Sequence, residues 1–305
     1  MKPALIYQWW NNSDKQVWED TKNPVIPSIA TIRASDPNLP IYVVDLSDVE
    51  RYWGTYPRTL NFRVIHTHPK IPLRRDDKTI HTETFNLCSR PFDLDWIMGK
   101  IREDTVIFCE SDIIWFRSLF PLDLESDKFC FNAFNSGFFH YQPKMPIVRD
   151  FFLHWKHLIL TGMISQDRRN DILKKYPWPV FQDETCMVYI NQVMPHLVHT
   201  ISQLDNLFFN PYLGFKDEYD NTKNYHFVGG LWGKNRGRAA LLLRPSFDRM
   251  KSVLSDRDMA MLFGKDYADY GGQYGFRDLV EVNKLLSRTM GNPSGDSNCH
   301  FQMMV

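Results

Sequence analysis

Four short apolar segments, separated by stretches with helical patterning, constrain the fold of this chain most. They occupy residues 4–9, 41–45, 62–65 and 106–109. Runs of this length are typical of buried strands, and strands that alternate with helices form parallel sheets with right-handed crossovers. We therefore expect an α/β fold with a mostly parallel central sheet flanked by helices.

The residues that follow these strands are the expected ligand site, because parallel sheets bind ligands at the carboxyl ends of their strands. The fourth strand runs directly into Glu110-Ser111-Asp112. If the chain stays extended here, the carboxylates of Glu110 and Asp112 point the same way, with Cα atoms roughly 6–7 Å apart. Two hard oxygen ligands so placed suit a divalent cation that also binds phosphates. Taken alone, the tripeptide favours a strand that ends in a polar turn, and its flanks carry the argument for a metal site.

The flanks of this tripeptide carry a family resemblance. Residues 106–122 read VIFCESDIIWFRSLFPL, which resembles the DxDxxWxRxP segment of GT-A glycosyltransferases of the nucleotide-diphospho-sugar transferase type. Glu110 stands in place of the first Asp, which keeps the charge on a longer arm, and Pro121 comes later than in the pattern. The resemblance implies a GT-A (Rossmann-like) fold, with Glu110 and Asp112 holding Mn²⁺ or Mg²⁺ and Ser111 beside the donor.

A second segment, FNAFNSGFFHYQP at residues 131–143, is similar to the NSG strand of the same family. An Asn at position 135 offers a donor and an acceptor to sugar hydroxyls. Gly137 would allow a ligand to approach the backbone closely. The alternative is a tight turn that leads into an aromatic core strand.

The third segment is Phe181-Gln182-Asp183-Glu184. It resembles the acidic-plus-Gln motif of the family in reversed order, and the resemblance places Asp183 near the transferred sugar. An Asp at the start of a helix is also simply a good cap.

The fourth segment spans residues 224–234 and contains His226, Gly229 and Lys234. It resembles a late His-x-x-Gly segment that supplies a third metal ligand, His226, and diphosphate contacts from Gly229 and Lys234. Neutral imidazole binds Mn²⁺ well beside carboxylates. The alternative is a histidine that belongs to the core.

Of three further segments, two are expected to be largely helical and one is polar and charged. Residues 78–100 predict two helices broken at Ser89-Arg90-Pro91; the family often carries a basic residue here that reaches the nucleotide, so Arg90 is a candidate, although it also fits a surface position. Residues 163–179 are polar and charged, and fit a mobile lid, an acceptor-side insertion or a solvated face. Residues 247–263 and 276–290 read as helices joined by a Gly/Tyr-rich link.

These segments suggest a catalytic domain at residues 1–239, a helical C-terminal appendage at 240–290 and a flexible tail at 291–305. The chain carries 36 basic and 36 acidic residues, which argues against a dedicated nucleic-acid or membrane-surface binder. Its five cysteines form no CxxC pair, which favours a reducing compartment. The first residues lack the apolar run of a signal peptide, so we expect a cytoplasmic enzyme of bacterial or viral type.

The resemblance implies a metal-dependent hexosyl- or pentosyltransferase that uses a nucleotide-diphosphate sugar and retains anomeric configuration. UDP is the commonest nucleotide among such enzymes. The acceptor is open between a glycan, a lipid-linked precursor, a protein and a modified base of viral DNA; basic residues interleaved with Trp232 give the last option some support. The rival classes are a metal-dependent phosphodiesterase or nucleotidyltransferase, and a non-catalytic GT-A-like binding module.

Overall fold

The computed structural model describes residues 2–10, 25–47, 53–81, 84–111, 113–122, 124–132, 135–175, 180–201, 224–226 and 244–263. Within these ranges it leaves out the side chains of residues 132, 135, 136, 225, 226, 244, 245, 261 and 263. The described strands are β1 (Pro3–Trp9), β2 (Ile41–Asp45), β3 (Arg63–His66), β4 (Thr105–Cys109), β5 (Ile113–Trp115), β6 (Phe129–Asn132), β7 (Asn135–Tyr141), β8 (Val198–Ile201) and β9 (Asn224–His226). The described helices are α1 (Val25–Arg33), α2 (Tyr56–Thr59), α3 (Phe85–Met98), α4 (Pro146–Ile164), α5 (Gln166–Leu173), α6 (Asp183–Val193), α8 (Arg244–Val253) and α9 (Asp256–Phe263), with a short 3-10 helix at Pro195–Leu197.

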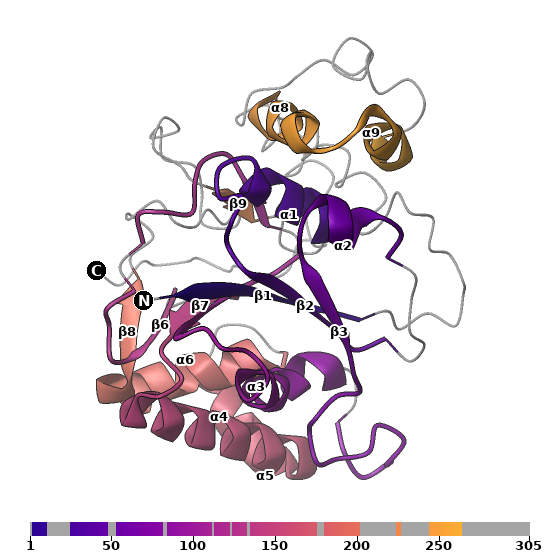
Figure 1. Cartoon of the computed structure of the whole chain (residues 1–305). Helices are drawn as coiled ribbons and strands as arrows, with labels where there is room; N and C mark the ends of the chain where they lie inside the picture. Colours follow the sequence, from indigo (N-terminus) through magenta and orange to yellow (C-terminus); the bar gives the residue numbers. More distant parts are fainter. Residues whose placement is uncertain are drawn as a thin grey trace, which may run out of the picture.

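A seven-stranded sheet in the order β3-β2-β1-β4-β7-β6-β8 forms the centre of the molecule (Figure 1). The pairs β1–β2, β2–β3, β1–β4 and β6–β8 are parallel, whereas β7 is antiparallel to both β4 and β6. The expected mostly parallel sheet is therefore confirmed, with β7 as the reversed strand. Because β7 runs the other way, its first residues lie at the edge where β1 and β4 end.

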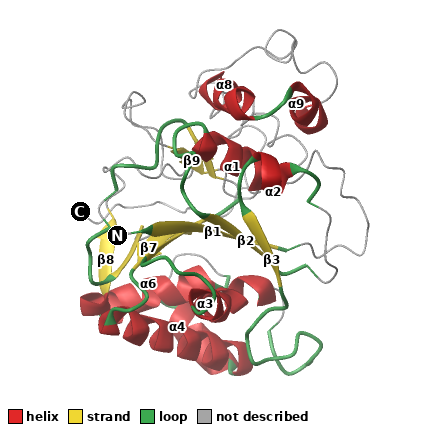
Figure 2. Ribbon diagram, viewed as in Figure 1, coloured by secondary structure: helices red, strands yellow, loops and turns green. Residues whose placement is uncertain are grey.

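Both faces of the sheet are covered by helices (Figure 2). Side chains alternate along a strand, and in β1 Leu5 and Tyr7 join a cluster with α1, while Ala4 and Ile6 join a cluster with α3, α4 and α6. The same alternation runs through β4, where Phe108 lies on the α3 side. Even-numbered side chains of β1 and β4 therefore face α3. The next even-numbered positions, Gln8 and Glu110, lie on the same side.

Helices α8 and α9 pack on the α1 side of the sheet. Met250 and Met259 are fully buried in the same cluster as Leu5. Arg249 of α8 donates two hydrogen bonds, of 2.9 and 2.6 Å, to the main-chain oxygen of Thr31 in α1. The described part of the C-terminal segment thus shares a core with the sheet, and the predicted division at residue 240 stays a prediction.

Two helical expectations need correction, and one polar segment is found to contain a helix. Helix α3 continues through Pro91 instead of breaking there, because its buried face is fixed by packing against the sheet and α4, which outweighs the missing proline N–H. Residues 166–173, within the polar segment at 163–179, form α5, which packs on α4 and α6. The helix expected at 247–263 is two helices, separated at Leu254 and Ser255, where the Ser255 hydroxyl accepts a hydrogen bond from the Asp258 amide and caps α9.

The four cysteines in the described part of the chain are free and buried, at positions 88, 109, 130 and 186. A search of the described helices finds none with the length and apolar character that crossing a membrane requires.

Candidate functional site

The backbones of two predicted motifs meet at the carboxyl end of β4. The Glu110 amide donates a 2.8 Å hydrogen bond to the carbonyl oxygen of Gly137 in β7. One residue earlier, Cys109 pairs with Phe138 across the antiparallel ladder. The reversed direction of β7 therefore brings the NSG strand beside the Glu110 segment.

Arg90 of α3 occupies the centre of this region. Its Nη2 donates to Glu110 Oε1 at 2.8 Å, and its Nη1 lies 2.7 Å from Asp183 Oδ2 at the first residue of α6. Its guanidinium carbon lies 4.6 Å from the centre of the Phe108 ring, within cation–π range. One buried cation thus joins α3, the end of β4 and the start of α6.

The charges in this cluster are mutually dependent. Burial alone would lower the pKa of Arg90, but the carboxylates of Asp183 and Glu110 outweigh it and raise that pKa. Burial raises the pKa of Asp183 to about 6, although Arg90 acts in the opposite direction. Arg90 and Asp183 are each 1% exposed, whereas the side chain of Glu110 is 25% exposed. Glu110 is therefore the member of the cluster that can meet a ligand directly.

The start of α6 holds Asp183 in place. Gln182 and Thr185 form a reciprocal capping box across the first turn, which satisfies orphan backbone donors there. The main-chain oxygen of Asp183 accepts a 3.0 Å hydrogen bond from the indole N–H of the buried Trp155. Asp183 thus faces Arg90 from a fixed helix end.

The chain turns at the predicted metal-binding tripeptide. The Ile113 amide donates to the Glu110 carbonyl oxygen at 3.3 Å, so the expectation of an extended chain through residues 110–112 is wrong. The i to i+3 hydrogen bond closes a turn that leads into β5. Strand β5 pairs with β9 so that Ile113 lies opposite His226, which brings the backbone of position 226 beside the end of this turn.

Several predicted site residues lie outside the described part of the chain. Asp112, Gly229 and Lys234 are not described, and neither are the side chains of Asn135 and His226. The structure brings Arg90, Glu110, Gly137 and Asp183 together, with Ser111 in the turn after Glu110. The roles predicted for all of these residues stay predictions.

Two polar residues at the site were not among those predicted from the sequence, Gln8 and Asp93. Gln8 is 6% exposed. It lies two residues after Ile6 in β1 and therefore on the same face of the sheet, toward α3. Asp93 is 1% exposed and lies three residues after Arg90 on α3. A polar residue at the end of a parallel strand was a usable signal for Gln8, but only the packing of α3 on the sheet reveals Asp93.

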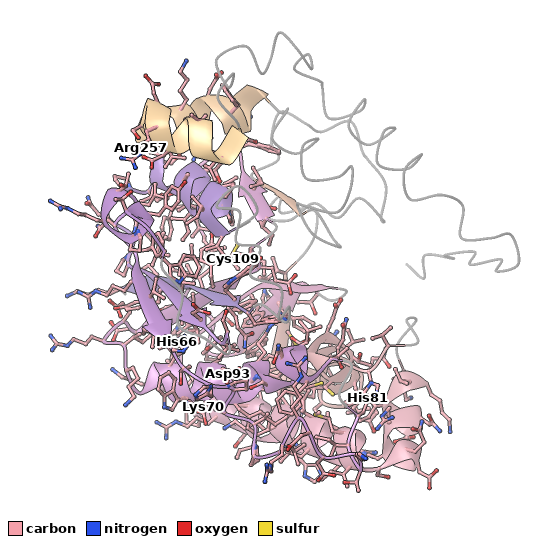
Figure 3. The ribbon with its side chains drawn as sticks, turned by 90° about the vertical axis from the view of Figure 1, so that its right-hand side faces the viewer. His66, Lys70, His81, Asp93, Cys109 and Arg257 are labelled. Atoms are coloured by element: carbon pink, nitrogen blue, oxygen red, sulfur yellow. The ribbon has the colours of Figure 1, made fainter. Side chains whose placement is uncertain are left out.

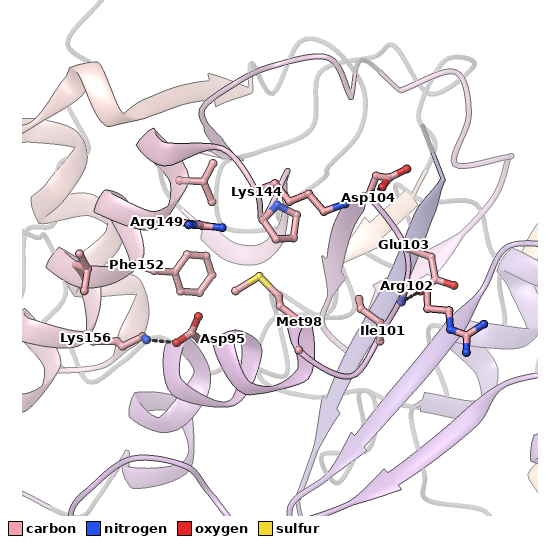
Figure 4. A pocket seen from close by; sticks show the side chains of 14 residues that line it. Asp95, Met98, Ile101, Arg102, Glu103, Asp104, Lys144, Arg149, Phe152 and Lys156 are labelled. Carbon is pink, nitrogen blue, oxygen red and sulfur yellow. Dashed lines mark hydrogen bonds and ion pairs between the residues drawn. The ribbon is translucent and has the colours of Figure 1, made fainter.

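A separate pocket lies near the amino end of β4, away from the cluster around Arg90 (Figure 4). Its volume is about 750 Å³, and α3, α4 and the segment before β4 line it. Asp95 of α3 and Lys156 of α4 form an ion pair along its wall. Asp95 is half exposed and lies on the same helix as Arg90 and Asp93, so a substitution at Asp95 can serve as a control for substitutions at those two residues.

The protein is similar in structure to solved glycosyltransferases, but its sequence matches no known family. No protein-family model and no curated protein matches the sequence. The galactosyltransferase LgtC, solved with donor and acceptor sugar analogues, is similar at a TM-score of 0.48 and 14% identity, over 83% of this chain and 96% of that chain.

Two further solved structures are also glycosyltransferases. GlyE of Streptococcus pneumoniae TIGR4 is similar at a TM-score of 0.45 and 15% identity, over 95% of this chain and 64% of that chain. The bifunctional glycosyltransferase WbbM is similar at a TM-score of 0.49 and 12% identity, over 86% of this chain and 51% of that chain. All three TM-scores are below 0.5.

Proposed function

We propose that this protein is a metal-dependent glycosyltransferase that takes a sugar from a nucleotide-diphosphate donor, UDP-linked by preference, and retains its anomeric configuration. The observation that carries the proposal is the cluster of Arg90, Glu110 and Asp183 at the carboxyl end of β4. Three segments that resemble glycosyltransferase motifs, far apart in sequence, contribute to it. Parallel sheets bind nucleotides at this edge.

The residues present fit a divalent cation. Glu110 offers a partly exposed carboxylate, the hard oxygen ligand that Mn²⁺ and Mg²⁺ take. The pairing of β5 with β9 places the backbone of His226 opposite Ile113, the residue that follows Asp112 in the sequence. Among the described side chains there is no group of three metal-ligating residues, and we propose Asp112 and His226 as the ligands that complete the set. When bound, the metal would neutralise charge that develops on the leaving diphosphate.

Arg90 and Asp183 would act by position and charge. A buried guanidinium next to Glu110 holds that carboxylate in one orientation through a charge-assisted hydrogen bond. Asp183 is buried behind Arg90, so we propose that it works through the guanidinium, as a fixed partner that keeps Arg90 at the site. Asn135, Ser111 and Gly137 would contact the donor, and Gly229 and Lys234 its diphosphate.

A panel of nucleotide sugars, with and without Mn²⁺, tests this proposal. Thermal unfolding should shift upward with one nucleoside diphosphate only when Mn²⁺ is present, because a ligand that saturates the folded state adds roughly 2.7 kcal/mol at a hundredfold excess over Kd. The matching nucleotide sugar should release its sugar slowly into water. A shift without sugar release would indicate a binding module, and no shift with any nucleotide would contradict the proposal.

The acceptor can be sought once the donor is known. Candidate glycans, proteins and duplex DNA with modified bases should each be offered with the labelled donor. The acceptor class is the one into which label is incorporated by the wild type, and incorporation should stop when Mn²⁺ is removed.

A further inference from the structure

Gln8 and Asp93 form a buried pair directly behind Arg90. The Gln8 side-chain nitrogen donates to Asp93 Oδ2 at 2.7 Å, and the Lys70 backbone amide donates to Asp93 Oδ1 at 2.7 Å. The Gln8 side-chain oxygen accepts a 3.3 Å hydrogen bond from Arg90 Nε. Figure 3 shows Asp93 and Lys70 close together. A continuous path of hydrogen bonds therefore runs from the segment after β3, through Asp93 and Gln8, to the guanidinium.

The charge of Asp93 determines which way the Gln8 amide faces. An ionised carboxylate only accepts hydrogen bonds, so it requires the NH₂ group of Gln8 and leaves the Gln8 oxygen toward Arg90. If Asp93 takes a proton from solvent, Lys70 still occupies Oδ1 and the proton resides on Oδ2. The O–H then donates to the Gln8 oxygen, the amide turns over, and its NH₂ group faces the N–H of Arg90.

We propose that Gln8 and Asp93 are positioning residues for the transfer reaction: ionised Asp93 orients the Gln8 amide, whose oxygen holds Arg90 between Glu110 and Asp183. Protonation of Asp93 replaces this acceptor with a donor and releases Arg90 from one of its contacts. The inference rests on the proposed function and adds a proton-dependent control of the same site.

The surroundings of Asp93 place its titration in the working range of an enzyme. Burial raises the pKa of Asp93 to about 7, while the Lys70 amide, the Ser89 hydroxyl, the Lys70 ammonium and Gln8 act in the opposite direction. The charged groups that face it are Lys70, from the segment after β3, and Arg90, on its own helix through Gln8. On α4, Lys156 pairs with Asp95 and lies over the Phe92 ring instead.

The variant Asp93→Asn isolates the proposed effect. Its oxygen can still accept from Lys70, and its NH₂ group donates to Gln8, so it reproduces the protonated state at every pH. Asp95→Asn is the matched control, because Asp95 lies two residues later on α3 and is half exposed. Gln8→Met removes the contact from the side of β1 and leaves the Lys70 contact in place.

Initial rates should be measured between pH 5.5 and 8.5 with the donor found in the nucleotide-sugar panel. We expect wild-type kcat to rise through a transition near pH 7, and Asp93→Asn to lack this transition. Above pH 7.5 its kcat should be about tenfold lower, with donor KM changed less than about threefold, since misplacement of a catalytic-site group reduces kcat by roughly ten- to a hundredfold. Gln8→Met should behave like Asp93→Asn, and Asp95→Asn like the wild type. An Asp93→Asn enzyme with the wild-type rate and pH profile would overturn the inference.

A second measurement needs neither turnover nor a variant that folds. In ¹⁵N-glutamine-labelled wild type, the side-chain amide signal of Gln8 should titrate with a midpoint near pH 7. A Gln8 signal that does not change between pH 5.5 and 8.5 would overturn the inference even if the enzyme is active. Absence of turnover with every nucleotide sugar would count against the proposed transferase alone, and the Gln8 titration would then decide whether the pair responds to protons.

Discussion

Arg90 lies fully buried between two carboxylates and an aromatic ring, and its surroundings explain why a guanidinium is suited to this position. Its planar group reaches Gln8, Glu110 and Asp183 at once, a geometry that a lysine ammonium cannot reproduce. Removing one partner from a buried ion pair leaves an uncompensated charge, which is strongly destabilising. The site is therefore a network in which each residue depends on the others.

Asp93 gives the network a measurable effect of pH on stability. The pKa of its carboxyl is about 7 in the folded protein, against an ordinary value of 3.8. The folded state therefore holds this proton where the unfolded state has lost it, and the free energy of unfolding contributed by Asp93 falls as pH rises from about 4 to about 7. We expect Asp93→Asn to lose this contribution.

Chemical denaturation at intervals between pH 4 and pH 8 measures this effect. The free energy of unfolding of the wild type, minus that of Asp93→Asn, should decrease across this range and level off above pH 7. A difference that is constant with pH would show that Asp93 ionises normally. The same proton is thus expected to favour stability at low pH and to hinder transfer, a common opposition between stability and activity.

At the scale of elements, the sequence predicts strands better than turns and helix ends. Strands β1 to β4 agree with the predicted apolar segments to within one residue at each end. Strands β1, β2 and β4 are largely buried, and strands covered by helices on both faces have nearly continuous apolar sequences. For the residues after Glu110 the sequence leaves an extended chain and a polar turn both open, and the hydrogen bond from the Ile113 amide to the Glu110 carbonyl oxygen decides for the turn. The sequence predicts a break at Pro91 because proline lacks the N–H that a helix needs. Helix α3 continues through Pro91 because its buried residues pack against the sheet and α4.

The close contact between α4 and the segment before α6 shows how elements place a site residue. Gly162 of α4 is buried against Phe181, and a Cβ atom at position 162 would lie 2.3 Å from the Phe181 ring. Phe181 is two residues before Asp183, and its carbonyl oxygen accepts a 2.5 Å hydrogen bond from the Thr84 hydroxyl just before α3. Glycine in α4 therefore allows Phe181, and with it the start of α6, to pack at the observed distance.

We expect Gly162→Ala to destabilise the protein by up to about 2 kcal/mol. Overpacking a close-packed core costs about 1–3 kcal/mol, and better helix propensity offsets up to about 1 kcal/mol of this cost. His154→Ala, on the exposed side of the same helix, is the control and should change stability little. Denaturant titration of both variants measures the effect. A Gly162→Ala protein as stable as the wild type would show that Phe181 moves aside without cost.

At the scale of the whole molecule, the site exists because distant segments end at one edge of the sheet. The period-two alternation of β1 and β4 directs Gln8 and Glu110 toward α3, and Ile6 pairs with Phe108 on the neighbouring strands. The reversal of β7 adds Gly137 to that edge. Sequence motifs identified Glu110, Gly137 and Asp183 one by one, but their assembly around Arg90 follows from topology, which no single motif contains.

The most direct test of the account is calorimetric titration of the nucleoside diphosphate found in the panel into wild type and Glu110→Gln, with and without Mn²⁺, with Asp95→Asn as the control. Glu110 is proposed to hold the metal that binds the diphosphate, so wild-type binding should require Mn²⁺. Glu110→Gln should bind at least roughly ten- to a hundredfold more weakly, since the loss of a residue that only supports a metal ligand already has an effect of this size. Asp95→Asn should bind like the wild type. Equal binding without Mn²⁺, or wild-type affinity in Glu110→Gln, would contradict the proposed metal-dependent transferase.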